Sequence, residues 1–133
     1  MPDKKEVARS PYSIFYHNHS DNILEFSWLK STSNMTDEDF QNENLQYAKL
    51  AENIKINYLL IDVRKFGHQF SDNLAEWRKA QIVPKYNNAG VEKMAFLHDK
   101  GFDLANMKEM DEGKYKTRHF NQVDDVKNWF ESK

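Results

Sequence analysis

The short apolar run at residues 58–63, with the sequence YLLIDV, constrains the fold more than any other stretch of the chain. A polar loop follows it, and apolar residues at helical spacing begin near Leu74. A buried strand, a loop and a covering helix make up the repeating unit of parallel α/β sheets. Because ligands of open α/β sheets bind at the carboxyl ends of the strands, we expect any site to lie near Asp62.

The same reasoning, applied along the whole chain, predicts one α/β domain. Strands are expected at residues 12–17, 22–29, 57–63, 93–98 and 116–120, and helices at about 36–54, 71–88, 104–110 and 122–132. The first two strands form an antiparallel hairpin, and the later alternation of strands and helices requires right-handed crossovers. The order β-β-α-β-α-β-α-β-α predicts a mixed four- to five-stranded sheet flanked by helices, in a single domain at residues 11–133. Residues 1–10 are expected to form a disordered tail.

Local signals add detail to this prediction. Thr36 and Asp39 form a variant of the capping box at the start of the first helix. Pro84 lies within the helical pattern at 71–88, where its missing amide proton should kink the helix or begin its last turn. Four large residues on apolar faces are expected to be buried in one core: Trp28, Leu60, Phe96 and Trp129.

The composition restricts the classes of partner. The chain has 133 residues, a net charge of −2 and no cysteine. Without an excess of positive charge there is no reason to expect a nucleic acid or an anionic membrane as a partner. The absence of cysteine excludes disulfides and cysteine-ligated metals. No run approaches the ~20 apolar residues of a membrane helix, and residues 1–10 do not resemble a signal peptide. We therefore expect a cytoplasmic protein with no transmembrane segment and no cofactor.

Four segments of the chain resemble a known family. The succession NILEFSW, YLLIDVRKF, VPKYNNAGVEKMAFL and YKTRHFNQVDDVKNWF is similar to the SpoIIAA-like family, whose members are related to the STAS domain. The similarity runs from about residue 12 to residue 130, and its most distinctive parts are residues 89–96 and the set Arg118, Phe120 and Trp129. The resemblance implies the mixed sheet of the CRAL-TRIO/SpoIIAA type and a regulatory binding module.

The resemblance also concerns one serine. Some STAS relatives are anti-anti-sigma factors, phosphorylated on a serine at the start of the helix after the third strand. Ser71 occupies roughly that place. Those switches have an Asp-Ser-Ser-Gly-type loop, whereas this chain reads HQFSDN, and Asp72 follows at once. We therefore expect Ser71 to be a helix cap that is not phosphorylated.

The loops after the third and fourth predicted strands form the expected binding surface. Because both strands are predicted to be parallel, these loops meet at one edge of the sheet. The residues are Asp62, Arg64, Phe66, His68, Phe70, Ser71, His98 and Asp99. We expect Asp62 to accept hydrogen bonds from loop amides or to pair with Arg64.

Two sets of residues carry reactive groups without a complete motif. Asp62, Ser71, His98 and Asp99 supply the base, hydroxyl and acid that acyl transfer or hydrolysis requires. No G-x-S-x-G elbow or glycine-rich oxyanion loop accompanies them, so no catalytic residue is assigned.

The second set comprises metal-ligand types at close spacing near a turn: His17, His19 and Asp21. The sequence specifies no further ligand from elsewhere, so a solvated turn is favoured and no metal site is assigned.

The expected function is a non-enzymatic regulatory or protein-interaction module, with a protein partner or self-association. The alternative is a carrier or sensor of a small apolar ligand. The ligand would lie between the sheet and the helix at 104–110, which carries Leu104, Met107 and Met110 at three-residue spacing. A continuous cavity there would favour the carrier, whereas a filled core with exposed apolar residues would favour protein binding.

Overall fold

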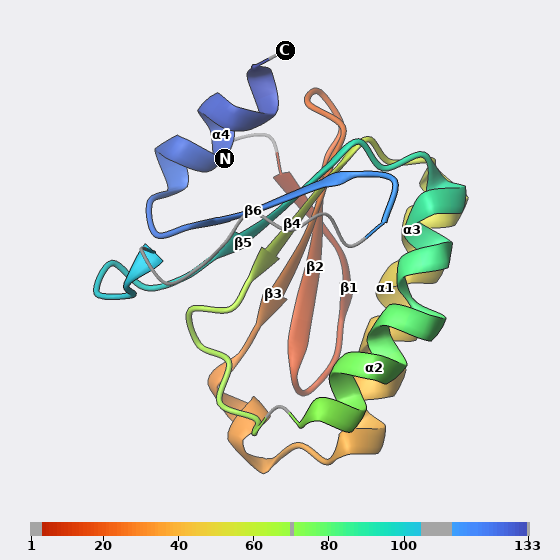
Figure 1. Ribbon diagram of the computed structural model, residues 1–133, viewed down its shortest axis with the longest axis vertical. Coiled ribbons are helices and arrows are strands. Elements are labelled where there is room, and N and C mark those ends of the chain that lie inside the picture. Colours follow the sequence, from red (N-terminus) through yellow and green to blue (C-terminus); the bar gives the residue numbers. More distant parts are fainter. Residues whose placement is uncertain (1–3, 70, 105–112, 133) are drawn as a thin grey trace.

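The computed structural model describes residues 4–69, 71–104 and 113–132, which form a mixed sheet with helices on both faces (Figure 1). The six strands of this part of the chain are β1 (Lys4–Arg9), β2 (Ser13–Asn18), β3 (Ile23–Trp28), β4 (Tyr58–Asp62), β5 (Lys93–Leu97) and β6 (Lys116–Phe120). They lie side by side in their sequence order. β1, β2 and β3 are antiparallel to one another, and β3 to β6 are parallel. The predicted single α/β domain with a mixed sheet is confirmed.

The helices divide between the two faces of the sheet. α1 (Asp37–Ile54), α2 (Asp72–Gln81) and α3 (Val83–Ala89) lie together on one face, and α4 (Val123–Glu131) lies on the other (Figure 1). The arrangement follows from the topology. β4 and β5 are added in the same direction across the sheet, and right-handed crossovers then place the connecting helices on the same face. Within the described residues, no helix is long and apolar enough to cross a membrane.

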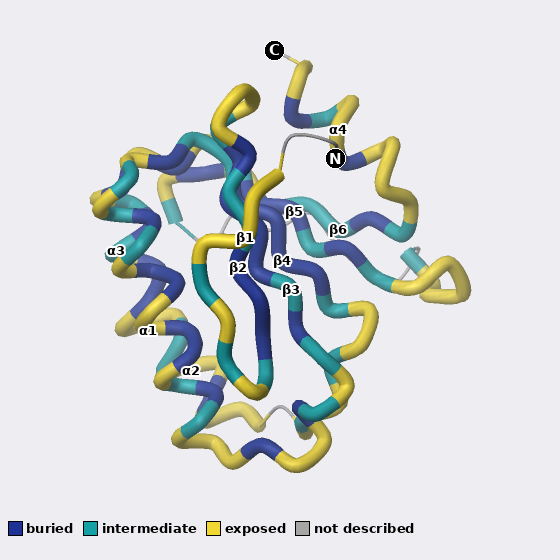
Figure 2. Tube along the Cα trace, turned by 180° about the vertical axis from the view of Figure 1, so that it is seen from behind, coloured by how far each residue is buried: buried dark blue, intermediate teal, exposed yellow. Residues whose placement is uncertain are grey.

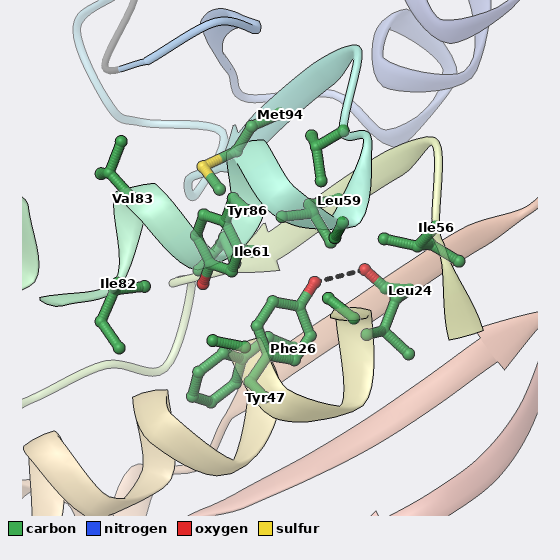
Figure 3. Close-up of a cluster of buried hydrophobic side chains, with 14 of the residues drawn as sticks. Leu24, Phe26, Tyr47, Ile56, Leu59, Ile61, Ile82, Val83, Tyr86 and Met94 are labelled. Carbon is green, nitrogen blue, oxygen red and sulfur yellow. Dashed lines mark hydrogen bonds between the residues drawn. The ribbon is translucent and has the colours of Figure 1, made fainter. Parts of the chain in front are cut away.

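The larger core fills the space between the sheet and α1 to α3. Alternate residues of the strands point into it, among them Phe26 of β3 and Ile61 of β4. Two fully buried tyrosines of the helices, Tyr47 and Tyr86, pack against these side chains (Figure 3). The Tyr47 hydroxyl donates a hydrogen bond to the Leu24 carbonyl oxygen, which satisfies this polar group within the core.

The smaller core lies on the opposite face, beneath α4. It is built from the intervening strand residues, and α4 covers it with Val126 and Phe130. The strand residues are Ile23, Leu60, Ala95, Leu97 and Phe120. Both faces of β4 and β5 are therefore covered, which accounts for their nearly continuous apolar sequences.

The predicted single core is wrong. Trp28 and Leu60 are both buried, but Trp28 belongs to the larger core and Leu60 to the smaller one. Phe96 and Trp129 are only half-buried and pack at the margins of these two cores, one on each face. The error has a physical reason. Successive strand residues point to opposite faces, so apolar residues in several strands share a core only when their registers agree.

The predicted disordered tail and strand number are also corrected. Residues 4–9 form the edge strand β1 rather than a tail, and the sheet has six strands rather than four or five. β1 is largely exposed, in contrast to the neighbouring strands (Figure 2). The Lys4 ammonium of β1 lies 4.3 Å from the centre of the Tyr16 ring in β2 and 3.3 Å from the Glu25 carboxylate in β3. This one side chain therefore links the edge strand to both of the next two strands.

The capping signal in the sequence is confirmed, whereas the predicted single helix at 71–88 is two helices in the structure. The Thr36 hydroxyl accepts from the Asp39 amide, and the Asp39 carboxylate accepts from the Thr36 amide, which completes the predicted capping box. The pattern at 71–88 is interrupted at Ile82, and Pro84 lies in the first turn of α3, where a missing amide proton costs nothing. The predicted helix at 104–110 lies outside the described residues, except for Leu104.

Candidate functional site

The carboxyl ends of β4, β5 and β6 form one edge of the sheet, and the candidate site lies there. Asp62 ends β4, His98 and Asp99 follow β5, and Asn121 follows β6. A hollow of about 260 Å³ lies at this edge. Its lining combines the loops after the three strands with the start of α4: Arg64, Leu97, His98, Asp99, Lys100, Asn121, Gln122, Val123 and Asp124. The predicted residues Arg64, His98 and Asp99 are thus brought together.

Asp62 is buried and bonded to Arg64. Its Oδ1 accepts from the Arg64 backbone amide at 3.1 Å. The Arg64 guanidinium donates to both carboxylate oxygens, with the shortest bond at 2.7 Å. This hydrogen-bonded carboxylate raises the pKa of Arg64, although burial opposes the shift. The expectation that Asp62 holds a loop amide or pairs with Arg64 is confirmed, because it does both and so orders this loop.

The middle of the same loop turns away from the hollow. The Phe66 ring packs 5.1 Å from Trp28 in the larger core. The Gly67 amide donates to the Thr32 hydroxyl at 2.8 Å, and His68 Nε2 lies 2.8 Å from Asp37 Oδ1 at the start of α1. The Phe66 ring also lies 6.1 Å from the Phe40 ring of α1, so Phe66 and His68 both attach the loop to α1. Phe70, also predicted for the surface, lies outside the described residues.

Ser71 caps α2, as expected. Its hydroxyl accepts from the Leu74 amide at 3.2 Å. Asp62 bonds to Arg64, and His98 bonds to His119. In the described structure, no hydrogen bond joins any two of Asp62, Ser71 and His98. The nucleophile and base contacts that hydrolysis requires are not formed among these three side chains.

His98 contacts a histidine that the sequence analysis did not select. His98 Nε2 and His119 Nδ1 are 2.9 Å apart. Burial and the neighbouring His119 lower the pKa of His98 to about 4, although the charge of Asp99 acts in the opposite direction. The sequence did contain a signal for His119, because this residue lies in the last predicted strand and His98 lies at the end of the strand before it. The sequence does not give the register between the two strands, and without the register the two histidines could not be paired.

Exposed apolar side chains lie at the same edge. Phe102 is 36% exposed and stacks on His98 with ring centres 3.9 Å apart. Val123, in the lining of the hollow, is 43% exposed. The Asn121 side-chain amide donates to the Phe102 carbonyl at 3.2 Å and to the Lys100 carbonyl at 3.5 Å. These bonds join the loop after β5 to the end of β6 and hold the apolar side chains beside the hollow.

The candidate group of His17, His19 and Asp21 does not form a metal site in the described residues. The rings of His17 and His19 are 5.7 Å apart, and Asp21 bonds to Asn18. In the described ranges, no group of three or more histidine, aspartate or glutamate side chains is arranged to hold a metal ion. Of the predicted apolar pocket, Leu104 is half-buried, and Met107 and Met110 lie outside the described residues.

Comparison with known proteins gives no relative for this arrangement. No family model, curated protein or solved structure matches the chain. The α/β class is established by the fold, and the SpoIIAA-like resemblance stays a prediction from the sequence.

Proposed function

We propose that the protein is a regulatory or protein-interaction module of the STAS-like type, without enzymatic activity. It binds its partner through the edge where β4, β5 and β6 end. The observation that carries this proposal is the exposure of Phe102 and Val123 at that edge. Aromatic anchors beside charged and polar rim residues are typical of protein interfaces.

The charges around these apolar side chains support a protein partner. Arg64 and Lys100 are cationic, and Asp99 and Asp124 are anionic, and all four line the hollow. A rim with both signs of charge suits a partner surface with a complementary pattern, which sets specificity and orientation more than affinity. A single-signed rim would instead favour a strongly charged polymer.

The packing of the larger core favours protein binding over the carrier function. Tyr47, Tyr86 and Tyr115 are almost completely buried between the sheet and the helices. Their rings meet edge to face, with centres 6.2 Å apart for Tyr47 and Tyr86 and 6.1 Å apart for Tyr86 and Tyr115. The larger core is therefore filled by aromatic side chains. Residues 105–110 of the proposed ligand pocket lie outside the described residues.

Affinity capture from cells that naturally make the protein tests the proposal. The rim variant is the double substitution Phe102→Ser and Val123→Ser. The matched control is Val7→Ser and Leu45→Ser, which replaces two apolar side chains of similar exposure, 43% and 37%, on β1 and α1. We expect the wild-type protein and the control to capture the same partner, and the rim variant to lose it.

The interpretation of this experiment requires folded variants and an identified partner. Circular dichroism should show the same unfolding midpoint for the rim and control variants. Titration calorimetry with the purified partner should show at least a tenfold loss of affinity for the rim variant only. Equal affinity of the rim variant and the wild-type protein would refute the proposed surface. A co-purifying apolar small molecule in native mass spectrometry would favour the carrier.

A further inference from the structure

Two imidazole rings from neighbouring parallel strands face each other at the edge of the sheet. His119 lies within β6, and His98 follows the last residue of β5. The His98 backbone amide donates to the Phe120 carbonyl at 2.7 Å, which continues the pairing of the two strands. Both side chains therefore project from paired backbone, and their facing nitrogens, Nε2 of His98 and Nδ1 of His119, are 2.9 Å apart.

Each ring is also held from one side by a phenylalanine. The His119 ring stacks on Phe96 with centres 5.0 Å apart and an angle of 14° between the planes. The His98 ring stacks on Phe102 with centres 3.9 Å apart and an angle of 12°. The two imidazoles are inclined to each other by 29°. The ring positions are thus set by packing before any ligand arrives, and such preorganisation reduces the entropy cost of binding.

The separation of the two nitrogens is close to that of two ligands on one metal ion. Zinc binds histidine nitrogen at about 2.0–2.1 Å in tetrahedral sites, which places two such nitrogens roughly 3.3 Å apart. The observed 2.9 Å is shorter by about 0.4 Å, because a shared proton joins the two nitrogens in a hydrogen bond. A bound ion would replace that proton, which moves to the other nitrogen of its ring, and both rings would turn so that their lone pairs point at the ion. We propose that His98 and His119 form a two-imidazole binding site for a late first-row transition-metal ion, with water completing the coordination shell.

The donor set defines the class of ion. Imidazole nitrogen favours zinc, copper and nickel, whereas magnesium and calcium favour oxygen ligands. Asp99 adjoins His98 and contributes negative charge that partly balances a bound dication. Two protein ligands leave coordination positions open to solvent, unlike the four ligands of a closed structural zinc site. This inference is independent of the proposed function, because it requires no partner.

Titration calorimetry with zinc chloride at neutral pH, on protein first treated with a chelator, provides the first test. We expect one ion per chain for the wild-type protein and at least a tenfold weaker affinity after His98→Ala or His119→Ala. The matched control is the double variant His17→Ala and His19→Ala, which removes the other close histidine pair. The control should bind zinc as the wild-type protein does. Loss of binding in the control, with retention in the His98 variant, would overturn the proposal.

Nitrogen-15 spectra of the histidine side chains in the wild-type protein give a second test that does not depend on folded variants. Zinc should shift Nε2 of His98 and Nδ1 of His119 at one equivalent, while His68 remains unchanged. Magnesium chloride at the same concentration should shift neither. Zinc shifts that appear on other histidines, or that do not saturate near one equivalent, would show that the His98–His119 pair is only a hydrogen bond.

Discussion

Replacing Gly113 by alanine tests how the segment before β6 packs on the helices. A Cβ atom at this position would lie 2.7 Å from Asn87 Oδ1 and 2.8 Å from Val83 Cγ1, both in α3. These distances are shorter than van der Waals contact. Val83 is buried and fixed by its helix, and Asn87 Oδ1 accepts from the Lys114 amide at 2.8 Å. The methyl group therefore cannot be accommodated without moving the segment or breaking this bond.

The expected loss of stability combines three terms. Overpacking typically costs about 1–3 kcal/mol, and the disturbed hydrogen bond from the Lys114 amide to Asn87 costs about 0.5–1.5 kcal/mol. Alanine restricts the unfolded chain more than glycine does, which offsets about 0.4–1 kcal/mol of this loss of stability. The central values give a net decrease of about 2 kcal/mol in the free energy of unfolding for Gly113→Ala. Urea denaturation followed by tryptophan fluorescence should show this as a lower midpoint with an unchanged slope.

Two other glycines provide matched controls for the same substitution. A Cβ atom on Gly101 would meet no atom within 4 Å, so Gly101→Ala should change the free energy of unfolding by less than about 0.5 kcal/mol. Gly90 has equally open surroundings, but its φ of 86° is unfavourable for alanine and predicts a loss of about 1 kcal/mol. The predicted order of destabilisation is Gly113, then Gly90, then Gly101. Equal midpoints for the Gly113 and Gly101 variants would refute the close packing on α3.

Substitutions at three further positions test the candidate site and the smaller core. Asp62→Ala leaves the Arg64 amide without its acceptor and should cost about 1–3 kcal/mol, whereas Asp62→Asn should cost less; equal losses in urea denaturation would contradict the proposed bonding. Ser71→Ala removes the cap on the Leu74 amide and should lower the free energy of unfolding by about 0.5–2 kcal/mol in the same assay, and an unchanged midpoint would exclude the cap. Because Trp129 is only half-buried, Trp129→Ala should cost about 2–3 kcal/mol, below the usual range for a core aromatic; an unchanged calorimetric melting temperature would show that α4 is not docked through this side chain.

The strands of the central sheet could be predicted because their sequences have few alternatives. The run at 58–63 is apolar, short and bounded by polar loops, and it forms β4 within one residue of the predicted ends. β1 was missed for the opposite reason. Its sequence, KKEVAR, is mainly charged. An edge strand tolerates such residues because its side chains are mostly in solvent, and charges there also discourage pairing with other chains.

The candidate site shows a different limit of sequence reasoning. The sequence predicted two parallel strands whose carboxyl ends meet, and Asp62 and His98 do lie at one edge of the sheet. The loop after β4 was treated as one surface, but Arg64 lines the hollow while Phe66 and His68 pack against α1 and its surroundings. Neighbours in a loop can serve different parts of a fold, since the path of the backbone decides which way each side chain points. That path depends on tertiary contacts that no local pattern encodes.

The sequential order of the strands has a consequence for how the chain can assemble. In the described sheet, each strand pairs with the one synthesised before it, so the sheet can extend in the direction in which the ribosome delivers the chain. The larger core can begin to form once α1 and β4 have emerged. The smaller core must wait for α4, because Val126 and Phe130 come from that helix. Until then Ile23 and Leu60 remain uncovered, so this apolar face stays exposed on the nascent chain until α4 has been synthesised.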